Sequence, residues 1–241
     1  MEKVAHGIWF IPGQDEFIPD SHTYVLGEPS TQDLSLIDPG LTGKGFYKIE
    51  AIQKMGVELE AIKRVILTHT HLDHIGCLPE ILEHLPWAEL WAHEAEATPL
   101  EQGDERTVYG MEMFRSMCEM QYGLKPGAFA RTVDRHLEGD EVLDIGGMKW
   151  QVIHIPGHSM GGIALYDDSR KTLIPGDVVY ADYAIGRFDL HGADPSELNR
   201  SLTRLAELEV DILLPGHNRI VKGLAPGYIR ETAKQWEPYL V

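Results

Sequence analysis

Long apolar runs, cysteines and basic residues are all scarce in this sequence. No apolar segment approaches the roughly 20 residues that span a membrane, and the first residues, MEKVAHGIWFIPG, contain no apolar signal-peptide core. The only two cysteines, Cys77 and Cys118, do not make a disulfide framework. We therefore expect a cytoplasmic protein with free thiols and no membrane association.

The scarcity of basic residues restricts the classes of partner. The 241 residues include 21 Lys and Arg against 38 Asp and Glu, which gives a formal net charge of −17. Such a surface repels phosphate backbones, and no cluster of Lys and Arg in the sequence offsets the acidic excess. We expect a small-molecule ligand and no nucleic acid, and the sequence leaves homo-oligomerisation open.

The organisation of the chain predicts one α/β domain over residues 1–241. The hydrophobic content of 43% is ordinary for a globular protein, and no low-complexity tract or Pro/Ser-rich linker divides the sequence. A mainly helical stretch at 95–122 is expected to belong to a helical insert near 95–132.

Apolar runs and turn residues predict the elements of two halves. In the first half we expect strands at 7–12, 22–27, 34–40, 64–68 and 88–93, and helices at 44–56 and 74–84. In the second half we expect a strand within 148–158 that ends in a loop, a hairpin of 162–168 with 171–177, helices at 195–208 and 225–238, and a strand at 211–217. Each half places strands before a helix, so we expect two αβ halves packed sheet on sheet.

An apolar stripe marks the helical stretch at 95–122. It consists of Met111, Phe114, Met117, Cys118 and Met120. Core packing is the favoured interpretation of such a stripe, and a substrate-facing lid is the alternative.

The segment THTHLDH at residues 68–74 places three histidines and an aspartate directly after a short apolar strand. Three further strands end in comparable polar loops, in VIHIPGHS, LIPGD and ILLPGH. Ligand sites of open α/β sheets lie outside the carboxyl ends of strands. The candidate residues are His69, His71, Asp73, His74, His158, Asp177 and His217.

The number of candidates indicates two metal ions. A single catalytic zinc needs three protein ligands and a water, whereas five histidines and two aspartates suit two divalent ions that share a bridge. Imidazole and carboxylate ligands favour zinc, with iron or manganese as alternatives. His93, His154 and His191 stand apart from this pattern and are expected outside the site.

The pattern HxHxDH, followed by a separate His, Asp and His on strand-end loops, resembles the metallo-β-lactamase superfamily. The resemblance extends from LIDPG at 36–40 to PGH at 215–217 and implies an αββα sandwich with the metals at one edge. It implies that His69, His71 and His158 hold one metal, that Asp73, His74 and His217 hold the other, and that Asp177 bridges them.

The same resemblance suggests roles for two residues outside the candidate ligand set, Asp38 and Cys77. Asp38 in LIDPG matches the first motif of the family, which implies a carboxylate that orients a ligand imidazole, with a turn aspartate as the alternative. Cys77 stands where many relatives have glycine, and inert packing is favoured over a narrowed pocket or oxidation sensitivity.

The expected activity is hydrolysis of an ester, lactone or thioester by a hydroxide held between the metals. Asp73 is a candidate to orient the nucleophile and transfer its proton, and Tyr180 matches a tyrosine with which lactonases of the superfamily contact the substrate carbonyl. Three alternatives remain: a mononuclear iron persulfide dioxygenase, a phosphodiesterase of the same superfamily, and a metal-binding module without activity.

Overall fold

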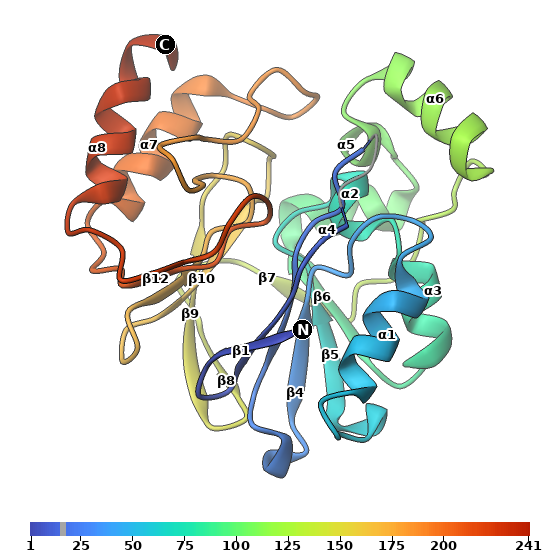
Figure 1. Ribbon diagram of the computed structural model, residues 1–241. Helices are drawn as coiled ribbons and strands as arrows, with labels where there is room; N and C mark the ends of the chain where they lie inside the picture. The colour runs from blue at the N-terminus through green and yellow to red at the C-terminus, as the bar shows by residue number, and fades with distance from the viewer. Residues whose placement is uncertain (15–17) are drawn as a thin grey trace.

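Two β-sheets form the centre of the molecule (Figure 1), which the computed structural model describes for residues 1–14 and 18–241. The first sheet has seven strands in chain order: β1 (Glu2–Ala5), β2 (Ile8–Ile11), β3 (Thr23–Leu26), β4 (Leu34–Ile37), β5 (Ile62–Ile66), β6 (Glu89–His93) and β7 (Arg135–Leu137). The second has six, in the order β13 (Val221–Lys222), β12 (Ile212–Leu213), β11 (Thr172–Ile174), β10 (Ile163–Asp167), β9 (Met148–His154) and β8 (Val142–Ile145).

Both sheets are mixed. Strands β1 to β4 pair in antiparallel fashion, and β4 to β7 pair in parallel. In the second sheet β11 and β12 are parallel and the other neighbours are antiparallel. Because parallel strands end at the same edge, the loops that follow them lie close together.

Helices cover the outer faces of both sheets. They are α1 (Gly45–Gln53), α2 (Leu72–Ile75), α3 (Leu78–His84), α4 (Glu94–Gln102), α5 (Arg106–Tyr109), α6 (Glu112–Tyr122), α7 (Pro195–Leu205) and α8 (Tyr228–Trp236), with short 3₁₀ turns at Pro29–Thr31, Leu59–Ala61 and Glu237–Tyr239. In Figure 1, α1 and α3 lie beside the first sheet, and α7 and α8 lie outside the second. None of the described helices combines the length and apolar character that crossing a membrane requires.

Three hydrophobic cores separate the layers, because side chains alternate between the faces of each strand. In β10, Ile163 and Leu165 pack between the two sheets, whereas Ala164 and Tyr166 pack in the core that α7 and α8 share. A third core joins the first sheet to α1 and α3. The layers are therefore helix, sheet, sheet and helix, which confirms the predicted αββα sandwich.

The predicted elements differ from the structure mainly in the helical stretch. The stretch at 95–122 is mainly helical, as predicted, but it consists of three separate helices, α4, α5 and α6. Gly103 and Gly110 end the first two, with φ of 72° and 71°, in the left-handed region that glycine adopts without strain. The helix expected at 74–84 is likewise two helices, α2 and α3.

A buried ion pair fixes the loop before β3 to α1. Lys48 Nζ lies 3.1 Å from Asp20 Oδ2, with both side chains fully buried, and also donates to the Ser21 carbonyl at 2.9 Å. Asp20 Oδ1 accepts a hydrogen bond from the Leu41 amide at 2.8 Å. Removing only one partner of such a buried pair strongly destabilises the fold, because the remaining charge is buried without compensation.

We expect Lys48→Met to lower the free energy of unfolding by about 3–5 kcal/mol, because it leaves the Asp20 carboxylate buried without its cation. The measurement is a denaturant midpoint by circular dichroism. Lys54→Met is the matched control, since Lys54 pairs with Glu50 at 3.0 Å on the exposed face of α1 and such pairs contribute little. Equal midpoints for the two variants would refute this role of the pair.

Candidate metal centre

Four strand-end loops meet at one edge of the sandwich. The loop after β5 carries THTHLDH and runs into α2, where His71 is the extended residue before the first helical turn. The loops after β9, β11 and β12 carry His158, Asp177 and His217. The structure thus brings all seven candidate residues together, in two groups of three and four side chains.

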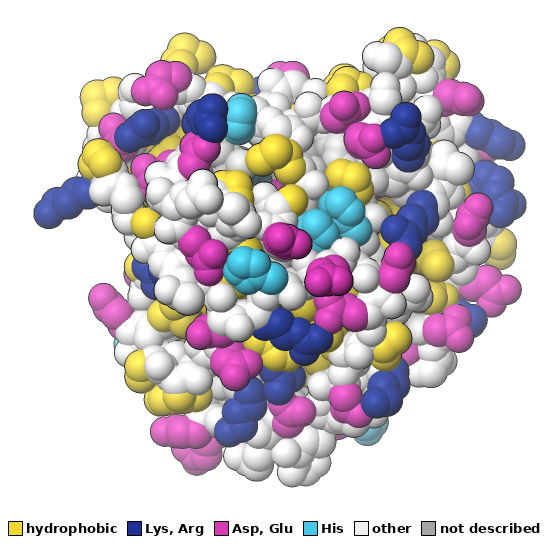
Figure 2. All heavy atoms as spheres, turned by 180° about the vertical axis from the view of Figure 1, so that it is seen from behind, with side chains coloured by type: hydrophobic (Ala, Val, Ile, Leu, Met, Phe, Trp, Pro, Cys, Tyr) yellow, Lys and Arg dark blue, Asp and Glu magenta, His cyan; other side chains and the backbone are white. Residues whose placement is uncertain are grey.

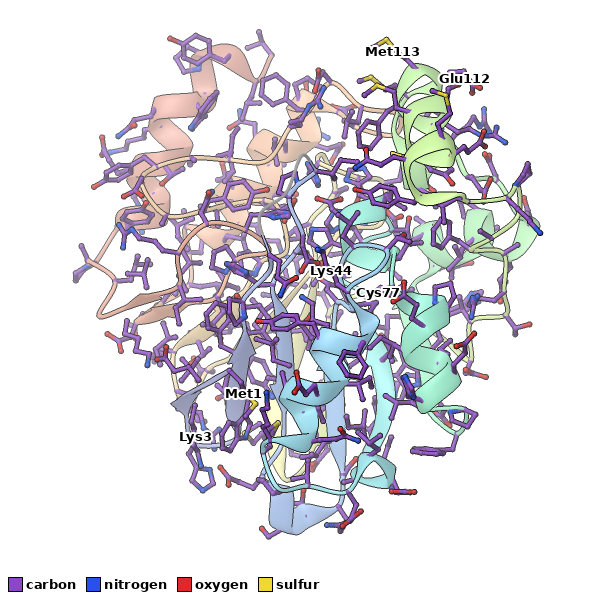
Figure 3. All side chains as sticks on the ribbon, turned by 45° about the vertical axis from the view of Figure 1, so that its right-hand side comes forward. Met1, Lys3, Lys44, Cys77, Glu112 and Met113 are labelled. Atoms are coloured by element: carbon purple, nitrogen blue, oxygen red, sulfur yellow. The ribbon has the colours of Figure 1, made fainter. Side chains whose placement is uncertain are left out.

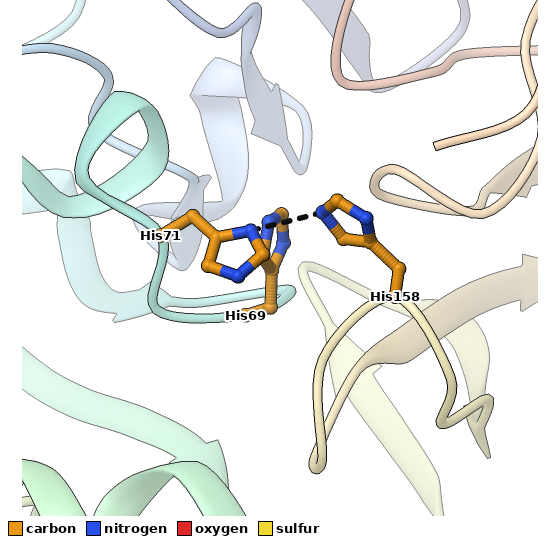
Figure 4. A group of neighbouring side chains, drawn as sticks. All are labelled: His69, His71 and His158. Atoms are coloured by element: carbon orange, nitrogen blue, oxygen red, sulfur yellow. Dashed lines mark hydrogen bonds between the residues drawn. The ribbon is translucent and has the colours of Figure 1, made fainter. Parts of the chain in front are cut away.

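The first group consists of His69, His71 and His158. Each can offer one ring nitrogen such that these atoms lie within 4.8 Å of one another, and all three residues are buried. His71 Nδ1 and His158 Nε2 face each other at 2.9 Å (Figure 4). Ring nitrogens around a tetrahedral zinc ion lie about 3.3 Å apart, so the spacing is close to that of ligands of one ion.

The second group consists of Asp73, His74, Asp177 and His217, again with ligand atoms within 4.8 Å. His217 Nε2 lies 2.9 Å from Asp73 Oδ2, and His74 Nε2 lies 3.2 Å from Asp177 Oδ1. Asp177 Oδ2 is also 3.8 Å from His158 Nε2 of the first group. Asp177 therefore lies between the two groups.

Unpaired buried atoms test whether these residues fit metal ions. Among the described residues, His69 Nε2 is buried without a hydrogen-bond partner, and His74 Nε2 and Asp177 Oδ1 are buried with no hydrogen bond, although they lie 3.2 Å from each other. An unpaired buried polar atom costs about 1–3 kcal/mol. Several such atoms at one place fit bound cations, since coordination by nitrogen and oxygen satisfies them.

Asp38 holds one imidazole of each group. Its Oδ2 lies 2.9 Å from His74 Nδ1 and accepts the Thr68 hydroxyl at 2.6 Å. The Thr68 oxygen lies 3.1 Å from His69 Nδ1. A proton on Nδ1 of each ring leaves Nε2 free for a metal, and the predicted contact of Asp38 with an imidazole is confirmed.

The electrostatics of the first group favour neutral imidazoles at His69 and His71. Burial and the nearby His74 keep the pKa of His69 well below its usual value. Burial and the neighbouring His158 lower the pKa of His71 to about 3. Metal ions bind the deprotonated ring nitrogen, so these rings are ready to act as ligands at neutral pH.

The second group is dominated by its carboxylates. Burial acts to lower the pKa of His217, but Asp177 and Asp73 outweigh it and raise that pKa to about 10. Burial acts to raise the pKa of Asp73, but the hydrogen bond with His217 outweighs it and lowers that pKa to about 2. The group therefore presents ionised carboxylates, which attract a divalent cation.

Glu96 is a buried residue near the site that the sequence did not indicate. Its side chain is 1% exposed; Oε1 accepts the Gly161 amide at 2.9 Å, and Oε2 accepts the hydroxyl of Thr70. Thr70 lies between His69 and His71, and Gly161 follows the His158 loop. Glu96 thus joins the two loops of the first group, although a glutamate in EAEATPLEQ reads as an exposed helical residue.

We expect Glu96→Ala to weaken metal binding by the first group, and hydrolysis with it, by about 10- to 100-fold, as is typical when a residue that orients ligands is lost. Glu96→Gln should retain most of both, because an amide oxygen still accepts the Gly161 proton. Glu94→Ala, at an exposed position of the same helix, is the control. The measurement is a metal titration of each variant. Equal metal affinities for Glu96→Ala and Glu94→Ala would show that metal binding does not depend on Glu96.

Tyr180 lies at the wall of a cavity of about 520 Å³ that opens onto both groups. Its side chain is buried and its ring centroid is 6.3 Å from that of His217. Burial and the Asp177 carboxylate keep the pKa of Tyr180 well above its usual value, so the phenol stays protonated. Tyr183, three residues further along the chain, is 40% exposed and stacks on Tyr228.

His93, His154 and Cys77 lie outside both metal groups and make packing contacts. His93 and His154 stack on each other with centroids 4.0 Å apart and belong to neither group. Cys77 is fully buried, its thiol donates to the Pro39 carbonyl at 3.0 Å, and burial raises its pKa. Figure 3 shows it within the fold, near Lys44. These contacts agree with inert packing, since an undissociated thiol reacts slowly.

The favoured interpretation of the methionine stripe as core packing is confirmed for Cys118, which is buried in the core of the first sheet, and for Phe114, which packs against that core, and is wrong for the methionines. Within α6 only Cys118 is buried, and Met113 and Met120 are 71% and 80% exposed (Figure 3 for Met113). Met111, Phe114 and Met117 line the cavity above the metal groups. The periodicity was real, but α6 lies at the rim of the site, so its apolar face borders a cavity.

Comparisons with known proteins identify the family of this chain. The sequence model of the metallo-beta-lactamase superfamily matches residues 19–217. The chain is 29% identical to hydroxyacylglutathione hydrolase GloC of Haemophilus influenzae, over 77% of this chain and 80% of that protein. It is 32% identical to acyl-coenzyme A thioesterase MBLAC2 of Homo sapiens, over 90% and 80%.

A solved structure agrees. The crystal structure of TTHA1623 in a di-iron-bound form has 28% sequence identity and a TM-score of 0.68, and the similarity covers 92% of this chain and 98% of that one. The family match includes all seven residues of the two groups.

Proposed function

The chain belongs to the metallo-beta-lactamase superfamily and is a metal-dependent hydrolase, and from this premise we propose that it cleaves thioesters with two metal ions. The observation that carries the proposal is the pair of adjoining groups with unpaired nitrogen and oxygen atoms. The di-iron form of a structural relative supports two ions. Two relatives whose names denote thioester substrates, GloC and MBLAC2, support the reaction.

The proposed ligands follow the two groups. His69, His71 and His158 hold one ion, and Asp73, His74 and His217 hold the other. Asp177 is the proposed bridge, because it belongs to the second group and lies 3.8 Å from His158. Zinc suits imidazole and carboxylate ligands, and iron and manganese remain alternatives.

In such a site divalent ions lower the pKa of a water molecule to about 7 and polarise the acyl carbonyl. The side chains around them handle protons and charge. Asp73, whose Oδ2 lies 2.9 Å from His217 Nε2 in the second group, is the proposed acceptor of the water proton. The water oxygen bonds to the acyl carbon, the C–S bond breaks, and the thiol leaves with that proton.

Tyr180 favours a second candidate reaction, lactone hydrolysis. Its protonated phenol at the cavity wall is placed to donate a hydrogen bond to a substrate carbonyl oxygen as negative charge develops. The same donor serves a thioester carbonyl, so the tyrosine supports acyl transfer in general. Both reactions keep the metal assignment unchanged.

The surface supports a small-molecule substrate over a nucleic acid. On the face in Figure 2, Lys and Arg side chains are interspersed with Asp and Glu. Several described Lys and Arg side chains are paired with acids, such as Arg219 with Asp182 at 2.7 Å and Arg204 with Asp140. A phosphodiesterase acting on nucleic acid needs an unpaired basic surface instead.

The test is a substrate panel of acyl thioesters, lactones and phosphodiesters, assayed with metal-loaded and chelator-treated protein. We expect thioester hydrolysis that disappears on chelation and returns with added metal. Hydrolysis confined to lactones would favour the second candidate. Phosphodiester cleavage without acyl hydrolysis would overturn the proposal.

A further inference from the structure

The cavity at the metal groups is lined by metal-group residues and by a set of apolar residues. Five of its lining residues belong to the metal groups: His71, Asp73, His158, Asp177 and His217. Five further lining residues are apolar or aromatic: Val108 and Tyr109 from α5, Phe114 and Met117 from α6, and Met111 from the two-residue link between these helices. We call these five residues the acyl wall.

Charge is nearly absent from the rest of the lining. Outside the metal groups, Arg187 is the one ionisable cation among the described lining residues, and Asp189 pairs with it in a bidentate contact at 2.8 and 2.9 Å. Arg187 and Asp189 are both largely exposed, at 59% and 63%, whereas the lining residues from α5, α6 and the link between them include no charged side chain that could pair with a charged substrate group. The cavity therefore suits an uncharged, apolar group.

The composition of the wall suits a flexible chain. Methionine has three rotatable bonds and a polarisable sulfur, so it adapts to ligands of different length. The link between α5 and α6 also contacts the segment that contains Leu190. The His191 amide donates a hydrogen bond to the Gly110 carbonyl at 2.8 Å, and Leu190 lies against Gly110. Leu190 lines the cavity with the wall.

Building on the proposed hydrolysis, we propose that the substrate carries an unbranched apolar acyl chain that binds along the acyl wall. The thioester carbonyl then lies at the metal groups and Tyr180, because the wall and these residues line one cavity of about 520 Å³. A volume in this range is typical of sites for small organic ligands. α6 thus determines acyl-chain specificity.

The first test compares thioesters that share one thiol and differ in the acyl chain, from acetyl to palmitoyl. We expect kcat/KM to rise with chain length until the cavity is filled, by up to about fourfold per methylene, the value for complete burial of that group. A flat or falling profile would overturn the inference while leaving thioester hydrolysis intact. Hydrolysis of no thioester would instead contradict the proposed function.

Two substitutions on one helix localise the effect. Met117→Gln should lower kcat/KM for a long-chain thioester at least about tenfold more than for the acetyl thioester, because a polar amide then borders the chain. Met113→Gln is the matched control, since Met113 is 71% exposed and outside the cavity lining. Equal losses for both chain lengths in Met117→Gln, or the same selective loss in Met113→Gln, would overturn the inference.

Binding provides a readout that is independent of turnover. Alkyl thioethers with the same thiol portion cannot be hydrolysed, and calorimetry on the metal-loaded protein measures their affinity. We expect affinity to rise with alkyl length, with an increasingly negative heat-capacity change that marks apolar burial. Affinity that is independent of alkyl length would contradict the inference even if no thioester were hydrolysed.

Discussion

Replacing His71 or Asp177 with alanine should abolish hydrolysis and lower the metal content of the same preparation. His71 is one of three buried imidazoles in the first group, and Asp177 lies 3.8 Å from His158 and 3.2 Å from His74. Losing such a ligand removes several kcal/mol of charge stabilisation, which corresponds to a rate reduced at least about a thousandfold.

The measurement combines initial rates with elemental analysis of each purified variant. His84→Ala is the control, because His84 is exposed at the end of α3 and belongs to neither group. Circular dichroism establishes that each variant is folded. Turnover retained in either His71→Ala or Asp177→Ala would refute the assignment of the site.

Tyr180→Phe should slow acyl hydrolysis by about ten- to hundredfold, since it removes one hydrogen-bond donor to the developing oxyanion. The ring that remains preserves the packing beside His217, so metal content should be unchanged. The effect should fall on kcat, because the contact strengthens only as charge develops.

The hydrolysis rate of Tyr180→Phe is measured with a lactone and with a thioester. If only lactone hydrolysis slows, the tyrosine supports the second candidate reaction. An unchanged rate with both substrates would remove Tyr180 from the catalytic residues. Tyr183→Phe is the matched control, since Tyr183 is 40% exposed and stacks on Tyr228.

The sandwich was predictable because burial on both faces of a strand leaves a distinct sequence pattern. Runs such as VIHIP and IALYD read as strands, and their side chains alternate between the inter-sheet core and the core beneath α7 and α8. The short edge strands β1, β7, β8 and β13 were not predicted. They are only two to four residues long and contain polar residues such as Arg135 and Lys222, so no extended apolar run marks them in the sequence.

The candidate residues were predictable because they are concentrated at strand ends. THTHLDH is distinctive by itself, and the later His158, Asp177 and His217 each follow a Pro-Gly turn. Glu96 was not predictable, since only the fold shows that its carboxylate accepts from Thr70 and Gly161. The apolar face of α6 was predicted, but periodicity cannot tell a core from a cavity.

The number and identity of the metal ions test the central claim most directly. Protein purified anaerobically without added metal is analysed for each element and for ions per chain. The two groups predict two divalent ions per chain, and they predict that Asp177→Ala reduces that number. One iron per chain, with oxygen uptake in the presence of a persulfide, would contradict the hydrolase and indicate a mononuclear dioxygenase.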